Sequence, residues 1–295
     1  MNKKIKVLLV CLLAAFGVIA SMAFTLGDTK PIKLSSVEIN KIMNAVNEFY
    51  EYSNCIASDQ SNSGQCSEQL RMHFFGGYDR MGCRIFNDFL PSSSSMVNEV
   101  VSNGYFRNSF GYVRALQNTH VQTTIQSVTP YGGEWTKIAK QPKYSASDPD
   151  TYVVVVSVKK QLRYDANDKG RTANQSINFT LPGFTISGIH GENNSGSASS
   201  STNTDENTGN YMTRAFQHYA NKEYKEALDL FEKQIALCQD PEAYYHSAVM
   251  YYKNQGCKGM GYRKRFEKFV ESMKIAADHG YDRAKFALNR EGIEY

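Results

Sequence analysis

YKEALDLF, residues 224–231, carries apolar or aromatic side chains at the spacing i, i+3, i+4 and i+7: Tyr224, Ala227, Leu228 and Phe231. This spacing places all of them on one face of an α-helix. Toward the C-terminus, small residues recur where two helices would have to approach closely, and a leucine follows them: Ala276, Ala277, Gly280, Ala284 and Leu288. Residues 210–295 are therefore predicted to form an all-α domain of paired helices.

Residues 215–252 resemble the tetratricopeptide repeat, a helix-turn-helix unit of about 34 residues. The positions that carry this resemblance are Tyr224, Ala227, Phe231, Ala248 and Tyr251. Residues 269–288 resemble the Sel1-like variant through the C-terminal set of small residues. Gln234 and Gln239 depart from the tetratricopeptide pattern. Only about two to two and a half units fit, whereas arrays usually need about three. The domain is expected to cap itself, to dock on the rest of the chain or to pair with another chain, and we favour self-capping together with a partner contact.

The resemblance also implies where a partner would bind, because tetratricopeptide arrays hold peptides on the concave surface formed by their first helices. The matching positions here are Met212, Phe216, Tyr219, Tyr245, Val249, Tyr252 and Lys253. Most of these are aromatic or aliphatic, so the resemblance implies an apolar partner surface rather than a clamp for a terminal carboxylate. The competing interpretation is that the tyrosines only pack between helices.

Residues 33–190 predict an α+β domain in which helices precede a curved antiparallel sheet. Ser35 and Glu38 fit a capping box, and an apolar helical face follows as far as Tyr52. Two further helices are expected at residues 67–75 and 80–89. Alternating and β-branched residues predict strands at 121–129, 152–164 and 176–189, the last with a bend at Pro182 and Gly183. In the order and length of its elements, this region resembles the cone-shaped fold of the nuclear transport factor 2-like superfamily.

The N-terminus and the middle of the chain indicate export and a two-domain organisation. Residues 1–23 resemble a cleavable signal peptide, with lysines before an apolar run and small residues before the cleavage position. The alternative is an uncleaved membrane anchor. Cleavage would leave a periplasmic or extracellular protein without stable membrane insertion. The short signal and the low-complexity linker suggest a bacterial envelope protein. Residues 191–209 contain no large apolar residue and predict a flexible linker between the two domains.

Charge and cysteine content restrict the partners and the cross-links. The chain has 33 Lys and Arg against 29 Asp and Glu, and part of this excess lies in the predicted signal. Its only dense basic cluster is at residues 263–265, so nucleic acid is not expected as a partner. Cys55 and Cys66 flank a polar segment between two predicted helices, which favours a disulfide between them. Cys238 and Cys257 would lie at opposite ends of a helix, too far apart for a disulfide.

The sequence contains no phosphate-binding loop, no His-Glu-x-x-His pair and no Gly-x-Ser-x-Gly turn. Neither a metal nor a cofactor is expected. We therefore favour an exported, non-enzymatic scaffold whose helical repeats bind a protein or peptide, with a homo-oligomer as a further possibility. The alternative is a small-molecule binder or an enzyme with its pocket in the N-terminal domain, where His120 and His190 would meet across the sheet, opposite Asp79 or Asp88.

Overall fold

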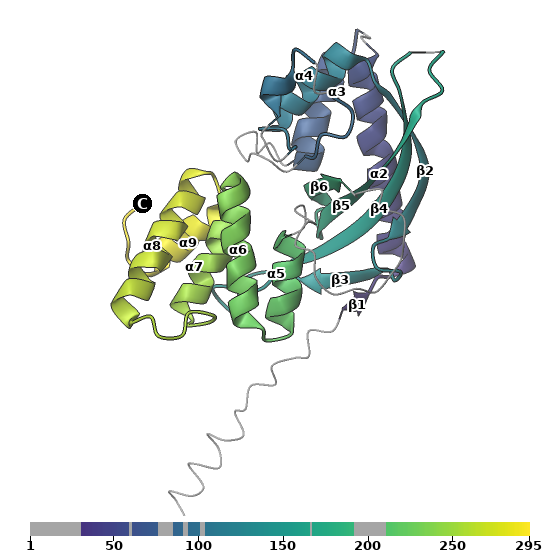
Figure 1. The fold of residues 1–295 in the computed structure, drawn as a ribbon. Helices are drawn as coiled ribbons and strands as arrows, with labels where there is room; N and C mark the ends of the chain where they lie inside the picture. Colours follow the sequence, from purple (N-terminus) through teal and green to yellow (C-terminus); the bar gives the residue numbers. More distant parts are fainter. Residues whose placement is uncertain are drawn as a thin grey trace, which may run out of the picture.

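The computed structural model describes residues 31–58, 61–75, 85–90, 94–100, 104–165, 167–191 and 211–295. The predicted signal at 1–23 and all of the predicted linker except Gly191 lie outside these residues. Within them, an α+β half extends to Gly191, and an all-α half begins at Tyr211 (Figure 1). The fold class is therefore the predicted one. In the described part of the chain, no helix has the length and apolar character needed to cross a membrane.

The first helix, α2 (Ser36–Ala57), begins at the predicted capping box. The side chain of Ser35 accepts a hydrogen bond from the Glu38 N–H, and the Glu38 carboxylate accepts one from the Ser35 N–H. Glu38 also lies 2.7 Å from the Lys137 ammonium of the sheet. The bonds from Lys137 and Ser35 lower the pKa of Glu38 to about 2. The start of α2 is thus fixed both locally and against the sheet.

Three short helical segments cover the end of α2. They are α3 (Ser63–Gln69), which continues into a π-helical turn, η1 (Leu70–Phe74), and α4 (Ser109–Thr119) with Asn108 as its N-cap. A single turn of 3₁₀ helix, η2 (Val97–Glu99), precedes α4. A disulfide joins Cys55 of α2 to Cys66 of α3, with an S–S distance of 2.01 Å. This is the pair that the sequence favoured.

Two sequence expectations for this region were wrong. The helix expected at 67–75 begins earlier, at Ser63. The helix expected at 80–89 is absent from its described part, where Ile85 and Phe86 form single β-bridges to Ile189 and Tyr105. The Phe86 N–H donates to the Ile189 carbonyl, so tertiary pairing overrides the local helical pattern. The helix α4 had not been expected.

Six antiparallel strands form the sheet: β1 (Ile32–Lys33), β2 (Gln122–Pro130), β3 (Thr136–Ala139), β4 (Tyr152–Arg163), β5 (Arg171–Leu181) and β6 (Thr185–Gly191). Their order is β1-β3-β4-β5-β6, and β2 also pairs with β4. The expected strands correspond to β2, β4 and the bent pair β5–β6, although β5 begins five residues early and β3 had not been expected. The helix α2 runs along the curved strands β2 and β4 (Figure 1).

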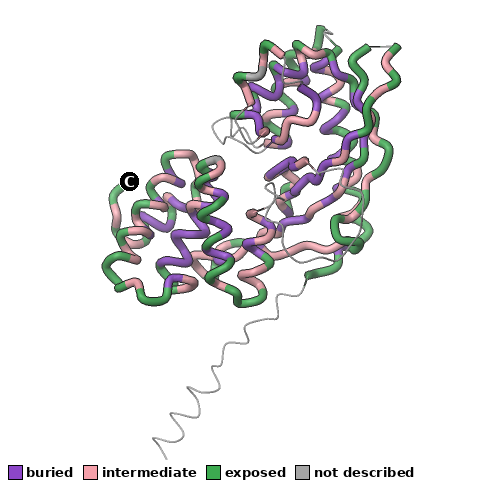
Figure 2. Tube along the Cα trace, viewed as in Figure 1, coloured by how far each residue is buried: buried purple, intermediate pink, exposed green. Residues whose placement is uncertain are grey.

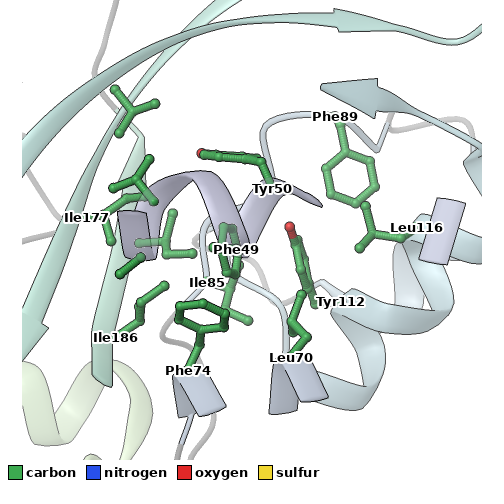
Figure 3. Packing of buried hydrophobic residues seen from close by; sticks show 14 of the residues in the cluster. Phe49, Tyr50, Leu70, Phe74, Ile85, Phe89, Tyr112, Leu116, Ile177 and Ile186 are labelled. Carbon is green, nitrogen blue, oxygen red and sulfur yellow. The ribbon is translucent and has the colours of Figure 1, made fainter. Parts of the chain in front are cut away.

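Large apolar side chains fill the space between α2 and the sheet. Figure 3 shows Phe49 and Tyr50 of α2 among side chains from the sheet and from the neighbouring helices: Ile177, Ile186, Phe74 and Tyr112. The ring of Phe49 lies 5.6 Å from that of Phe74 and 6.1 Å from that of Tyr112. All these side chains are buried. The interior of the α+β half is therefore a packed core. The alternative drawn from the sequence had placed a ligand pocket in this half.

Five helices form the second half: α5 (Tyr211–Ala220), α6 (Tyr224–Cys238), α7 (Pro241–Tyr252), α8 (Tyr262–Asp278) and α9 (Asp282–Arg290). Buried residues occur along all five helices (Figure 2), and they form two clusters, one around α5 and α6 and one around α8 and α9. The predicted stripe of α6 is inside, with Ala227 and Phe231 fully buried. The small residues of α8 and α9 are also buried, among them Ala276 and Ala284. Small side chains thus let these two helices pack closely, as the sequence indicated.

Gly256, in the connection between α7 and α8, provides a test of this packing. Its φ is +77°, and a Cβ there would lie 2.4 Å from the Tyr224 carbonyl oxygen. Gly259 has a φ of +88° but nothing within 4 Å of such a Cβ. We expect Gly259→Ala to lower the free energy of unfolding by about 1 kcal/mol, through backbone strain alone. Gly256→Ala should lower it by about 3 kcal/mol, because the overlap with α6 adds to the strain. Urea denaturation measures both losses, and equal losses would contradict the close approach.

Candidate functional site

The two halves share a hydrophobic core. Val153 of β4, with Ile138 and Val155 packed beside it, belongs to the same cluster as Ala215 and Phe216 of α5. Buried residues of α6 and α7, such as Phe231 and Met250, belong to this cluster as well. The structure therefore differs from two domains that hang separately on a linker. The helical half docks on the rest of the chain, and the sheet covers an apolar helical face that would otherwise meet water. The last helix, α9, also packs on α8 through Ala284 and Leu288.

A loop of the sheet completes the contact. Residues 140–151, which connect β3 to β4 and are called the β3–β4 loop below, lie against α7 and its neighbours. The helical residues that hold the loop, called the docking face below, are Glu242, Tyr245, His246, Tyr252, Lys253, Phe269 and Glu291. They come from α7 and the residue after it, from the middle of α8 and from the residue after α9.

Three consecutive residues of the loop are bound through their main chain. The Pro142 carbonyl accepts from Nδ1 of His246 at 3.0 Å. The Lys143 carbonyl accepts from the Lys253 ammonium at 2.6 Å. The Tyr144 N–H donates to the Tyr245 hydroxyl at 3.2 Å. These bonds use backbone N–H and C=O groups, which every residue except proline carries as a pair. This part of the docking face therefore does not depend on the loop's side chains.

The side chain of Tyr144 adds a specific contact. Its ring stacks on Phe269, with centroids 6.0 Å apart and planes 16° from parallel, and lies 5.6 Å from the ring of Tyr252. Its hydroxyl donates to the carboxylate of Glu291, which also accepts from the Tyr252 hydroxyl at 3.0 Å. The Arg290 guanidinium lies 5.8 Å from the centre of the Tyr144 ring. Tyr144 is thus an aromatic anchor with a bonded polar tip.

A buried ion pair joins the base of the loop to α7. The Lys140 ammonium lies 2.8 Å from the Glu242 carboxylate and 2.7 Å from the Thr180 hydroxyl of β5. The side chains of Lys140 and Glu242 are only 4% and 11% exposed. Either charge alone would be costly to bury, so each partner requires the other.

His246 is fully enclosed beside this pair. Its ring stacks on Phe231, with centroids 5.4 Å apart, and meets the edge of Phe216. Burial lowers its pKa below the ordinary value. Because the Pro142 carbonyl can only accept, Nδ1 carries the proton of the neutral ring. The other nitrogen, Nε2, then faces the Glu242 carboxylate at 3.7 Å.

A small cavity with both polar and apolar lining lies next to the ion pair, where the two halves meet. Its lining includes Lys140, Asn178, His190, Thr213, Gln234 and Glu242. The enclosed space of about 10 Å³ is the size of one water molecule. Without rearrangement, this cavity has no room for an organic substrate.

The acid-base arrangement considered from the sequence does not form among the described residues. His190 contacts Tyr105 and Asn178, whereas His120 bonds to the Ala57 carbonyl, so the two histidines do not meet. Asp88 forms an ion pair with Lys160 at 2.8 Å, and Asp79 lies outside the described residues. Across the same part of the chain, no group of three or more His, Cys, Asp and Glu is placed to hold a metal ion.

The residues predicted to face a partner differ in exposure: some are buried, some half-buried and some exposed. Phe216, Tyr245 and Val249 are buried, with exposed fractions of 1%, 1% and 0%. Met212 is half-buried in the lining of the cavity, and the half-buried Tyr219 bonds to Gln255. Tyr252 and Lys253 are exposed and touch the loop. The expectation of one open surface was thus wrong for Phe216 and Val249, which pack inside. Tyr245 is buried too, and its hydroxyl bonds to the loop at Tyr144 and Asp148.

Sequence reasoning missed Glu242, His246, Phe269 and Glu291, and it missed the loop itself. One signal was present. In α7, PEAYYHSAVMYY, aromatic and aliphatic residues occur on all sides, and every residue is buried except Tyr244 and Tyr252. A helix of this kind has no free face and requires cover from several directions.

Comparison of the chain with known protein families, with characterised proteins and with solved structures finds no match. The docking face is therefore interpreted from its own geometry.

The buried ion pair predicts a double-mutant result. Lys140→Met leaves Glu242 buried without its partner and should lower the free energy of unfolding by about 3–5 kcal/mol. In Lys140→Met/Glu242→Leu no unpaired charge remains, so most of this loss should be recovered. Arg263→Met is the control, because the ion pair of Arg263 with Glu267 is exposed and should have no measurable effect. Denaturant unfolding tests all three variants, and additive losses in the double variant would contradict a coupled pair.

His246 predicts a pH dependence. Its pKa is lowered in the folded state, so below about pH 6.5 the unfolded chain binds more protons at this residue. Stability is then complete above about pH 6.5 and falls as the pH decreases toward the folded pKa, by at most about 1.4 kcal/mol per pH unit. His246→Gln should flatten this slope, whereas the exposed His73→Gln should retain it. The contribution of Glu38 is lost only below its ordinary pKa of 4.5. Unfolding measurements at pH 5–7 therefore report the effect of His246 without that of Glu38.

Proposed function

We propose that this chain is a non-enzymatic interaction protein whose helical half binds an extended segment of a protein partner on the docking face. One observation carries the proposal: the docking face already holds three consecutive residues of the β3–β4 loop through their main chain, at Pro142, Lys143 and Tyr144. Such bonding is how extended peptides are generally recognised, with side-chain pockets adding specificity. The resemblance of the helical half to tetratricopeptide and Sel1-like repeats supports the same function by analogy.

The packing of the α+β half gives less support to the alternative, a small-molecule binder or enzyme. Its interior is occupied by aromatic and aliphatic side chains such as Phe49 and Ile177. The cavity between the halves has room for about one water. The buried Lys140 and Lys160 are each paired with a carboxylate at 2.8 Å. These lysines stabilise the fold where they lie and are not free to act on a substrate.

Export is part of the proposal. The apolar run and small residues of the first 23 positions support a signal peptide. The disulfide between Cys55 and Cys66 supports an oxidising compartment, such as the periplasm or the exterior of the cell. A partner is then expected among exported or surface proteins.

Peptide binding tests the proposal in the full-length chain. Tyr144→Ala removes the aromatic anchor of the loop but keeps its main-chain bonds, so it should raise the fraction of molecules whose docking face is free. A fluorescent peptide with the sequence of residues 139–150, AKQPKYSASDPD, should bind this variant, and a scrambled peptide should not. Adding Tyr252→Ala should weaken binding by about tenfold, through the loss of one aromatic contact, whereas Tyr262→Ala at the start of α8 is a matched control. Fluorescence anisotropy gives the affinities, and equal binding of the scrambled peptide would contradict the proposal.

A further inference from the structure

The docking face presents two distinct kinds of contact to its occupant. His246, Lys253 and Tyr245 bind main-chain groups. Phe269, Tyr252 and Glu291 instead surround one side chain, that of Tyr144, with a stacking surface and a carboxylate acceptor. A carboxylate that accepts from a phenol distinguishes tyrosine from phenylalanine, because phenylalanine leaves the acceptor without that donor.

The loop can leave the docking face without opening the sheet. Ala139 pairs with Tyr152, and the Lys140 N–H donates to the Thr151 carbonyl at 2.9 Å, so the base of the loop is closed independently of α7. Beyond that base, Lys143 and Asp148 bond to each other inside the loop. The halves also remain joined by the apolar cluster around Val153 and Phe216. Release of residues 142–148 therefore leaves the pairing of β3 with β4 and the apolar cluster between the halves in place.

From these observations we infer that the docking face selects a partner segment by its tyrosine, and that the β3–β4 loop is a built-in competitor for the same place. This inference rests on the proposed function and names its partner chemistry: an extended segment with a tyrosine that stacks on Phe269 and donates to Glu291. The partner gains access only when the loop leaves, so its apparent affinity is reduced by the fraction of molecules whose docking face is free.

A peptide series tests the selectivity, with full-length Tyr144→Ala as the receptor. Relative to AKQPKYSASDPD, the peptide with Phe in place of Tyr should bind about tenfold more weakly, because it lacks the hydrogen bond to a charged acceptor. The peptide with Ala at that position should bind about 50-fold more weakly, because it also loses the aromatic contacts. Adding Glu291→Gln to the receptor should reduce the difference between Tyr and Phe to about threefold or less. Glu294→Gln, a change of the same kind three residues away, should leave the difference intact.

The competitor role is tested in the wild-type chain. The tyrosine peptide should bind wild type at least tenfold more weakly than it binds Tyr144→Ala. Hydrogen exchange needs no variant: the Tyr144 amide, protected by its bond to Tyr245, should exchange faster when the peptide is added at millimolar concentration. Circular dichroism of each variant checks that it is folded.

Three outcomes would overturn the inference alone, and a fourth would overturn the proposed function with it. If the Tyr, Phe and Ala peptides bind equally well while a scrambled peptide does not, the docking face binds segments without reading tyrosine, and the proposed function stands alone. If wild type and Tyr144→Ala bind equally well, the loop is not a competitor. If light scattering shows a wild-type dimer that Tyr144→Ala abolishes, the occupant is the loop of a second copy. Failure of every peptide to bind Tyr144→Ala would remove the proposed function itself.

Discussion

The ion pair of Lys140 with Glu242 is the constraint on which the arrangement of the two halves depends. It connects the end of β3 to the first turn of α7, and Thr180 extends it to β5. Because both side chains are nearly inaccessible to water, separating them would leave two buried charges unpaired, whereas apolar contacts alone would tolerate sliding. The pair therefore selects one register between sheet and helices. Once that register is set, His246 meets Pro142 and Tyr144 reaches Phe269.

The sheet and its loop also cover apolar faces of the helical half. Five helices have few neighbours of their own kind, so apolar residues at the edge of the helical half require cover from another part of the chain. Val153 covers the α5–α6 side, while the β3–β4 loop covers α7. The helical half thus buries part of its apolar surface against the α+β half, although each has its own secondary structure.

Local features were predictable because local interactions specify them. The capping box at Ser35, the small residues of α8 and α9 and the β-branched runs of β2 and β4 all act over a few residues, and each is present in the fold. The docking face was not predictable, because its parts lie far apart in the sequence: Pro142 and His246 are 104 residues apart. No periodicity connects such residues. Apolar residues on all sides of α7 indicate that other parts of the chain cover this helix, but they do not indicate that a hairpin loop does. At residues 85–90 the local pattern predicts a helix, but Ile85 pairs with Ile189 of β6 instead.

The closed base of the β3–β4 loop has a practical consequence. A segment held between Ala139 and Tyr152 meets the docking face at the effective concentration of an intramolecular reaction, often millimolar for a short connection. Candidate partner sequences could be grafted there in place of residues 142–148 and compared through the melting temperature of the whole chain. Each graft would be a covalently attached ligand, so even weak binders would register. The β3–β4 loop can thus carry grafted sequences whose binding to the docking face is measured as a change in the stability of the chain.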